Sequence, residues 1–100
     1  MNNKQGHRIP THPGVILKEE FLVPLKISQV TLAAALHIPY RRINEITNKK
    51  RGIAPATALR LSKYFGITPG FWMNLQLSWD LYHAMKKEEK VLSKLQALKS

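Results

Sequence analysis

Apolar residues recur along this chain at steps of three and four, the spacing that places them on one face of an α-helix. In the first such segment, 14–22, Val15, Ile16 and Leu17 are followed by Phe21 and Leu22. Later segments repeat the spacing, and short polar stretches separate them. The pattern predicts an all-α chain of five helices, at 14–22, 29–36, 39–47, 55–65 and 69–85.

Residues that start and stop helices stand at the ends of these segments. Ser28 is a good N-cap for the second helix, and Thr11 or His12 is expected to cap the first, which Pro13 opens. Pro24 is expected to end the first helix because proline lacks the N–H that continues it. Three prolines at first helical positions and one left-handed stop complete the set: Pro39, Pro55, Pro69 and Gly66.

The third predicted helix differs from the others in having only two inward apolar residues, Ile43 and Ile46, three apart. It should therefore have one buried edge and polar faces elsewhere. The second and fourth helices have broader apolar faces, made of Val30, Leu32, Ala33 and Leu36, and of Ala58, Leu61 and Phe65.

The length of 100 residues suits one compact domain, predicted at 12–85. A flexible lead of 1–11 precedes it, and a basic extension of 86–100 follows. The extension has a weaker apolar set, so the sequence leaves open whether it is helical, frayed or ordered by a partner.

The chain carries 16 Lys+Arg against 6 Asp+Glu, a formal charge of +10. Such a charge favours a polyanionic partner, nucleic acid before all others, because neutralised phosphates release counterions. An anionic membrane would attract the same charge, but only the C-terminal tail resembles a basic amphipathic helix. Cysteine is absent, which excludes disulfides and thiol chemistry. The apolar stretches are too short to span a membrane, and the start lacks a secretory signal, so a cytoplasmic location is expected.

A pair of short helices, Gln29 to Leu36 and Pro39 to about Thr47, is joined by a tight turn through His37 and Ile38. This spacing is typical of a helix-turn-helix, whose second helix enters the major groove of DNA. Ile43 and Ile46 would pin that helix, so its opposite face carries the base readers. These are Tyr40, Arg41, Arg42 and Glu45, with Arg41 or Arg42 as the main specificity residue because arginine binds guanine O6 and N7 in a fork.

The residues beside this helix are predicted to contact phosphates, which position the protein rather than specify a sequence. Gln29 is expected to donate to a phosphate or to brace a recognition side chain. The run after the helix would set affinity and salt dependence: Asn48, Lys49, Lys50 and Arg51. Plainer interpretations remain: Arg41, Arg42 and Glu45 as a solvated, salt-bridged face, the run as a soluble loop, and Tyr40 as packed on the domain.

Several segments together resemble the HigA-type antitoxins, also labelled virulence-associated protein I, within the XRE and lambda-repressor-like helix-turn-helix group. They fall within about residues 12–85 and comprise 12–21, Leu32-Ala33, 42–46, 57–61, 64–66 and 71–76. The resemblance implies a five-helix dimer that represses its own operon. It also implies that the protein neutralises a small HigB toxin, a RelE-like, ribosome-dependent mRNA endonuclease.

Two residues depart from this family's pattern. His37 stands where such proteins usually carry glycine in the turn, and Lys49 stands where they usually have glycine after the asparagine. Either residue would be strained by about 1–2 kcal/mol if its φ is positive, unless Asn48 takes up one of the turns.

The last predicted helix carries more aromatic bulk than the other four can cover. Because helix-turn-helix proteins bind two half-sites as dimers, Phe71, Trp72, Leu75 and Trp79 are the predicted dimer interface. Each of them could equally belong to the core of one subunit.

Catalytic and metal-binding patterns are missing from the sequence. The four histidines are scattered without ligand spacing, and Asp80 is the only aspartate. We therefore predict no enzyme, no metal and no cofactor. The expected partners are double-stranded operator DNA, a HigB-like toxin and a second copy of the chain. The alternatives are a stand-alone XRE-type regulator, a helical module that only sequesters a protein, and, least favoured, a small nucleic-acid enzyme.

Overall fold

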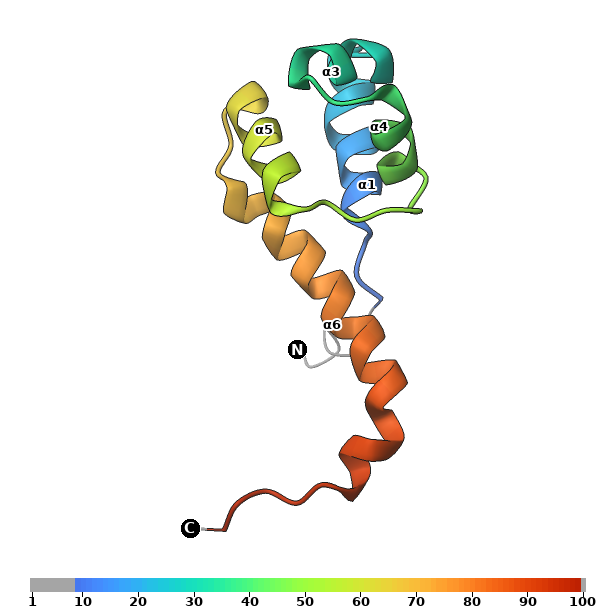
Figure 1. The fold of residues 1–100 in the computed structure, drawn as a ribbon, viewed down its shortest axis with the longest axis vertical. Coiled ribbons are helices and arrows are strands. Elements are labelled where there is room, and N and C mark those ends of the chain that lie inside the picture. The colour runs from blue at the N-terminus through green and yellow to red at the C-terminus, as the bar shows by residue number, and fades with distance from the viewer. Residues whose placement is uncertain (1–8, 100) are drawn as a thin grey trace.

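The structure, a computed structural model, describes residues 9–99 and contains only helices and connecting segments in that range (Figure 1). The first helix combines three segments without a break: α1 (Pro13–Ile16), the π-helical η2 (Leu17–Leu22) and α2 (Val23–Leu25). Four more follow: α3 (Gln29–Leu36), α4 (Tyr40–Thr47), α5 (Pro55–Phe65) and α6 (Pro69–Lys94). The predicted all-α, five-helix fold is confirmed. Residues 1–8 of the predicted lead lie outside the described residues.

The first helix continues through Pro24, so the prediction that this proline ends it is wrong. In η2 the N–H of Val23 donates to the carbonyl of Lys18, five residues back. A proline in a regular helix clashes with the carbonyl four residues back. The wider π turn relieves that clash, and the helix runs to Leu25.

The predicted helix starts are mostly confirmed. His12 caps α1, since its Nδ1 accepts from the N–H of Gly14 at 2.9 Å, and Ser28 Oγ accepts from the N–H of Thr31 at 3.0 Å. Pro39, however, is the N-cap of α4 and not its first helical residue. Its ψ of 139° is extended, and its carbonyl already accepts from the N–H of Arg42 at 3.0 Å.

Three helices are followed by a residue other than glycine whose backbone is in the left-handed conformation: Lys26 (φ 57°), His37 (φ 57°) and Lys49 (φ 64°). In each turn the N–H of the following residue donates a hydrogen bond to the carbonyl five residues earlier. Lys50, for example, donates to Glu45 O at 2.8 Å. The expected strain at His37 and Lys49 is therefore present, at about 1–2 kcal/mol each. Asn48 does not relieve it, because its φ is −95°.

The core lies where α3, α4, α5 and the start of α6 meet the first helix. Ile43, Ile46 and Trp72 are completely buried, and the rings of Phe21 and Trp72 lie 5.0 Å apart. The predicted inward edge of α4 is confirmed. Val30 is 64% exposed, so its assignment to the inward face of α3 is wrong. It lies two residues before Leu32, about 200° away around the helix axis.

Helix α6 gives the molecule its elongated shape of 53 × 28 × 24 Å. Its first turns pack on α5 and α1, and its C-terminal half projects beyond the other helices (Figure 1). The helix continues past Met85 to Lys94, into the predicted basic extension. Several apolar side chains along it stay exposed: Leu77, Leu81, Met85, Val91 and Leu92.

Candidate nucleic-acid interface

Helix α4 is held against α1 at close range. A Cβ atom added to Gly14 would lie 1.7 Å from the carbonyl oxygen of Ile46, so the two backbones meet where only glycine fits. Ile43 and Ile46 point into the core on this side. The opposite side of α4 presents Tyr40 and the two arginines, Arg41 and Arg42, to solvent.

Glu45 organises the arginines around this exposed side. Its Oε1 accepts from Arg51 Nε at 2.9 Å, and its Oε2 lies 3.4 Å from Arg41 Nε. The hydrogen bond from Arg51 lowers the pKa of Glu45 below its ordinary value, and the charges of Arg51 and Arg41 act in the same direction. Arg42 and Pro39 line the same shallow depression. Three of the four predicted base readers, Arg41, Arg42 and Glu45, thus line one depression together with Arg51.

The segment after α4 is fixed by Gln76 of α6, a residue distant in the sequence. Its Oε1 accepts from the N–H of Ile53 at 2.7 Å, and its Nε2 donates to Asp80 Oδ1 at 2.9 Å. A Cβ on Gly52 would approach that amide to 2.6 Å. The four predicted phosphate-contact residues are all exposed on this loop: Asn48, Lys49, Lys50 and Arg51.

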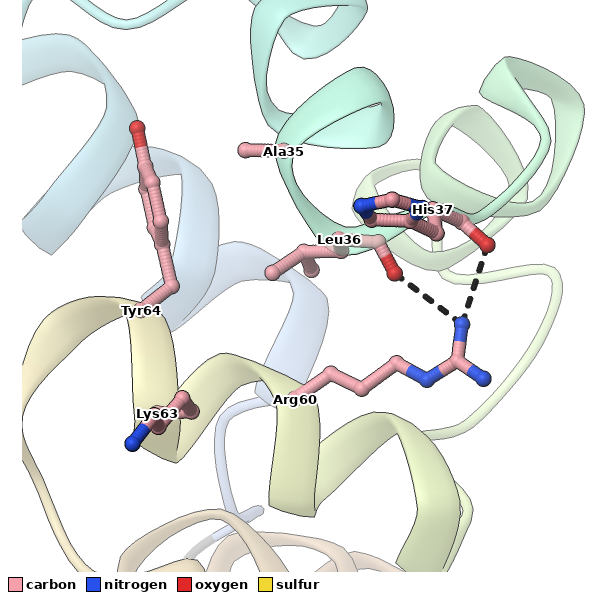
Figure 2. Close-up of a pocket in the computed structure, with 6 residues that line it drawn as sticks. All are labelled: Ala35, Leu36, His37, Arg60, Lys63 and Tyr64. Carbon is pink, nitrogen blue, oxygen red and sulfur yellow. Dashed lines mark hydrogen bonds between the residues drawn. The ribbon is translucent and has the colours of Figure 1, made fainter.

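Arg60 of α5 holds the turn between α3 and α4. Its Nη1 donates to the carbonyls of Leu36 and His37 at 3.0 and 2.9 Å, and both bonds are drawn in Figure 2. These carbonyls end α3, where a cation also complements the helix dipole. The turn that aims α4 is therefore fixed by a residue far away in the sequence.

Three residues important for this geometry received no role in the sequence interpretation: Asn44, Arg60 and Gln76. Asn44 Nδ2 donates hydrogen bonds to both Gln29 and Tyr40. Gln29 is thereby connected to Tyr40, one of the predicted base readers. Asn44 and Gln76 lie inside segments that carry the family resemblance, which was the available signal. Arg60 also lies inside such a segment, 57–61, but its own chemistry gave no sign of its role, because its partners are backbone carbonyls.

The four predicted dimer residues do not share one environment. Trp72 is completely buried within the subunit, so it is a core residue and has no surface for a partner. Phe71 is 36% exposed, and Leu75 packs partly against the core. Trp79 is half-buried and packs edge to face against His12, with ring centres 4.9 Å apart. Phe71, Leu75 and Trp79 remain predicted dimer residues.

His12 is buried and accepts a hydrogen bond, so it must be neutral to cap α1. Burial lowers its pKa, as does the charge of Lys49, while Asp80 opposes them. In the unfolded chain this histidine takes up a proton near pH 6.5. We therefore expect the free energy of unfolding to fall as the pH drops from 6.5 toward the lower pKa of the folded state.

The measurement is denaturant unfolding from pH 7.5 to 5 for the native chain and for His12→Asn. Asparagine caps helices without titrating in this range, so the variant should lose less stability on acidification. Parallel curves for the two proteins would show that His12 does not carry the effect.

In the described range 9–99, no group of three or more histidine, aspartate or glutamate side chains gathers as a metal site would require. None of the helices described is both long and apolar enough to cross a membrane.

A family profile described as "Helix-turn-helix" matches residues 17–72. Virulence-associated protein I of Dichelobacter nodosus is 46% identical over 80 residues, 80% of this chain and 74% of that protein. The HTH-type transcriptional regulator YbaQ of Escherichia coli is 36% identical over 91 residues, which cover 88% and 80% of the two chains.

Among solved structures, the antitoxin HigA of Pseudomonas aeruginosa with the higBA promoter superposes with a TM-score of 0.86 and 38% identity. The match covers 90% of this chain and 99% of that one. The matched profile includes α3, α4 and α5, the elements that build the arginine-rich face. The chain therefore belongs to the helix-turn-helix family, in the group that contains virulence-associated protein I and the HigA antitoxins.

Proposed function

We propose that this protein binds double-stranded operator DNA as a homodimer, represses transcription there, and acts as the antitoxin of a HigB-type toxin. The observation that carries the DNA-binding part is the outer face of α4. Ile43 and Ile46 are completely buried, so the arginines on the other side of a two-turn helix stand outward as a narrow edge. The similarity to a HigA antitoxin with promoter DNA supports the same assignment.

Base recognition is assigned to the N-terminal half of α4. The Arg41 side chain is 88% exposed, and Arg42 is exposed beside it. Each guanidinium can donate two hydrogen bonds to O6 and N7 of a guanine. Glu45 restrains Arg41 and Arg51 before DNA arrives, which lowers the entropy lost when they are fixed on DNA. Arg51 is exposed beside Glu45 and is assigned a phosphate contact.

Affinity without sequence preference is assigned to the loop 48–51. Its three cations are exposed, and each one that neutralises a phosphate adds to the salt dependence of binding. Arg60 of α5 holds the turn before α4, and Gln76 of α6 holds Ile53, just after the loop. The reading edge and the phosphate-binding loop should therefore move as one body.

The dimer interface is assigned to α6, with Phe71, Leu75 and Trp79 in the N-terminal half of that helix. Leu77, Leu81 and Met85 form a second row at four-residue steps and are each more than half exposed. This row begins two residues after Leu75, so it lies on another side of α6. A row of this kind on a projecting helix is apolar area that a second copy could bury. Two-fold pairing would present two copies of α4 to a palindromic site.

Loss of either arginine should reduce sequence discrimination. We expect Arg41→Ala or Arg42→Ala to weaken binding to the preferred duplex by about ten- to a hundredfold, and binding to random DNA far less. The measurement is fluorescence anisotropy at fixed salt, with a duplex selected by the native chain from a random pool.

Two controls separate specificity from charge. Lys87→Ala removes one positive charge from exposed α6 and should leave binding nearly unchanged. Lys50→Ala should weaken both duplexes alike and reduce the salt slope by about one. Equal losses on both duplexes for the arginine variants would contradict their assignment as base readers.

The antitoxin role is tested through the reading frame beside this gene. Expression of its product should arrest growth if it is an mRNA endonuclease, and co-expression of this chain should relieve the arrest through a complex that co-purifies. Arrest without relief or complex would contradict the role. The similarity to the regulator YbaQ favours a second candidate, a stand-alone regulator, which predicts operator binding and no toxin frame. A module that only sequesters a protein would bind no duplex.

A further inference from the structure

The side-chain amide of Asn44 lies at the centre of a hydrogen-bond network that joins the two helices of the helix-turn-helix. Its Nδ2 donates to Gln29 Oε1 at 3.2 Å and to Tyr40 Oη at 3.3 Å. Its Oδ1 accepts from Asn48 Nδ2 at 3.2 Å. One amide thus connects the first residue of α3, the first residue of α4 and the first residue of the loop.

The direction of these bonds decides which atoms Gln29 and Tyr40 offer to DNA. Gln29 accepts through its carbonyl oxygen, so the two hydrogens of its Nε2 remain for an outside acceptor. Tyr40 accepts through its hydroxyl oxygen, so its hydroxyl hydrogen also remains. Phosphate oxygens, guanine O6 and N7 are all acceptors. The network therefore presents both side chains as donors.

Without Asn44 this polarity would be lost. The Gln29 amide could turn over and present its carbonyl oxygen to a phosphate, and the Tyr40 hydroxyl could rotate freely. Each would have to be ordered on binding, and a side chain held in its bound orientation loses less entropy. Asn44 is half-buried and stands beside the reader Glu45, so it acts at the edge of the contact surface.

We infer that Asn44 is a positioning residue for DNA recognition, which holds Gln29 and Tyr40 as hydrogen-bond donors toward acceptor atoms of the DNA. The inference rests on the proposed DNA-binding function. It assigns to Asn44 an effect on binding that passes through two other side chains, and this makes it separable from a direct contact.

The first test is a pair of double-mutant cycles on the selected duplex. In the native chain we expect Asn44→Ala, Gln29→Ala and Tyr40→Phe each to weaken binding by about five- to tenfold, the effect of one hydrogen bond. In the Asn44→Ala background, Gln29→Ala and Tyr40→Phe should each cost less than about twofold, because the oriented donors are already lost. Losses that multiply would overturn the inference.

The second test concerns polarity. Asn44→Asp keeps the shape of the side chain, but its carboxylate can only accept hydrogen bonds. The Nε2 group of Gln29 and the hydroxyl hydrogen of Tyr40 should therefore turn toward this carboxylate. This variant should bind the duplex more weakly than Asn44→Ala. Val30→Asp places the same charge on an exposed neighbour of Gln29, outside the network, and should bind more tightly than Asn44→Asp. The reverse order would overturn the inference.

Thermal unfolding of each variant separates binding from folding, and Asn44→Asp serves as the isosteric substitute if Asn44→Ala does not fold. If the native chain selects no duplex from the pool, the proposed DNA-binding function is wrong. If it selects a duplex but the losses multiply, only the role of Asn44 is wrong.

Discussion

Trp72→Ala should destabilise the folded chain by about 4 kcal/mol, because it removes a large, completely buried ring and leaves a cavity. The ring lies 5.0 Å from both Phe21 and Phe71, so it joins the first helix to α6. Urea unfolding followed by circular dichroism, at one protein concentration, measures the loss. A loss below about 1 kcal/mol would contradict the core assignment of Trp72.

Two variants make this test specific. Leu59→Ala shortens a side chain that is 61% exposed on α5 and should change stability by less than about 0.5 kcal/mol. Trp72→Phe should cost much less than Trp72→Ala. It retains an aromatic ring and removes an indole N–H that is buried without a hydrogen-bond partner in the described range.

Gly14→Ala should destabilise the fold by about 3 kcal/mol, at the upper end of overpacking effects. The new methyl group would lie 1.7 Å from Ile46 O, and backbone atoms must shift to make room. Because that carbonyl belongs to α4, the shift should also weaken binding to the selected duplex. Unfolding and anisotropy on the same preparation measure both effects.

Gly70→Ala is the matched control. It lies in the first turn of α6, and its nearest neighbour would be Thr68 Oγ1 at 3.9 Å, an ordinary contact. Alanine is the better helix former, so this variant should be stabilised by about 0.5–1 kcal/mol. Equal effects at Gly14 and Gly70 would show that close packing of α1 on α4 does not limit stability.

Local sequence signals were sufficient for the helices and most of their ends. Periodic apolar residues located all five helices, and Ser28 and Gly66 marked ends correctly because a cap or a positive φ depends on neighbours along the chain. The short α4 with one apolar edge was readable for the same reason. Its outward face followed from Ile43 and Ile46 alone.

The errors arose where an outcome depends on contacts distant in sequence or on local helix geometry. The first helix continues through Pro24 by means of a π turn, which the sequence pattern did not predict. Val30 is apolar, so its side chain gave no indication that it faces solvent. Trp72 was assigned to a dimer surface because aromatic bulk on one helix does not show which neighbours cover it. Phe21, 51 positions away along the chain, lies against it.

The sequence by itself determined that this protein is a small, basic, all-helical molecule with an exposed arginine edge on a short helix, since periodicity, caps and charge are properties of neighbouring residues. Only the tertiary structure decided how that edge is aimed. Gly14, Arg60 and Gln76 fix α4 and its loop from three other helices, and Asn44 sets the orientation of the side chains beside it. These contacts form only after distant segments pack, and each depends on distances below about 3.5 Å that no local pattern encodes.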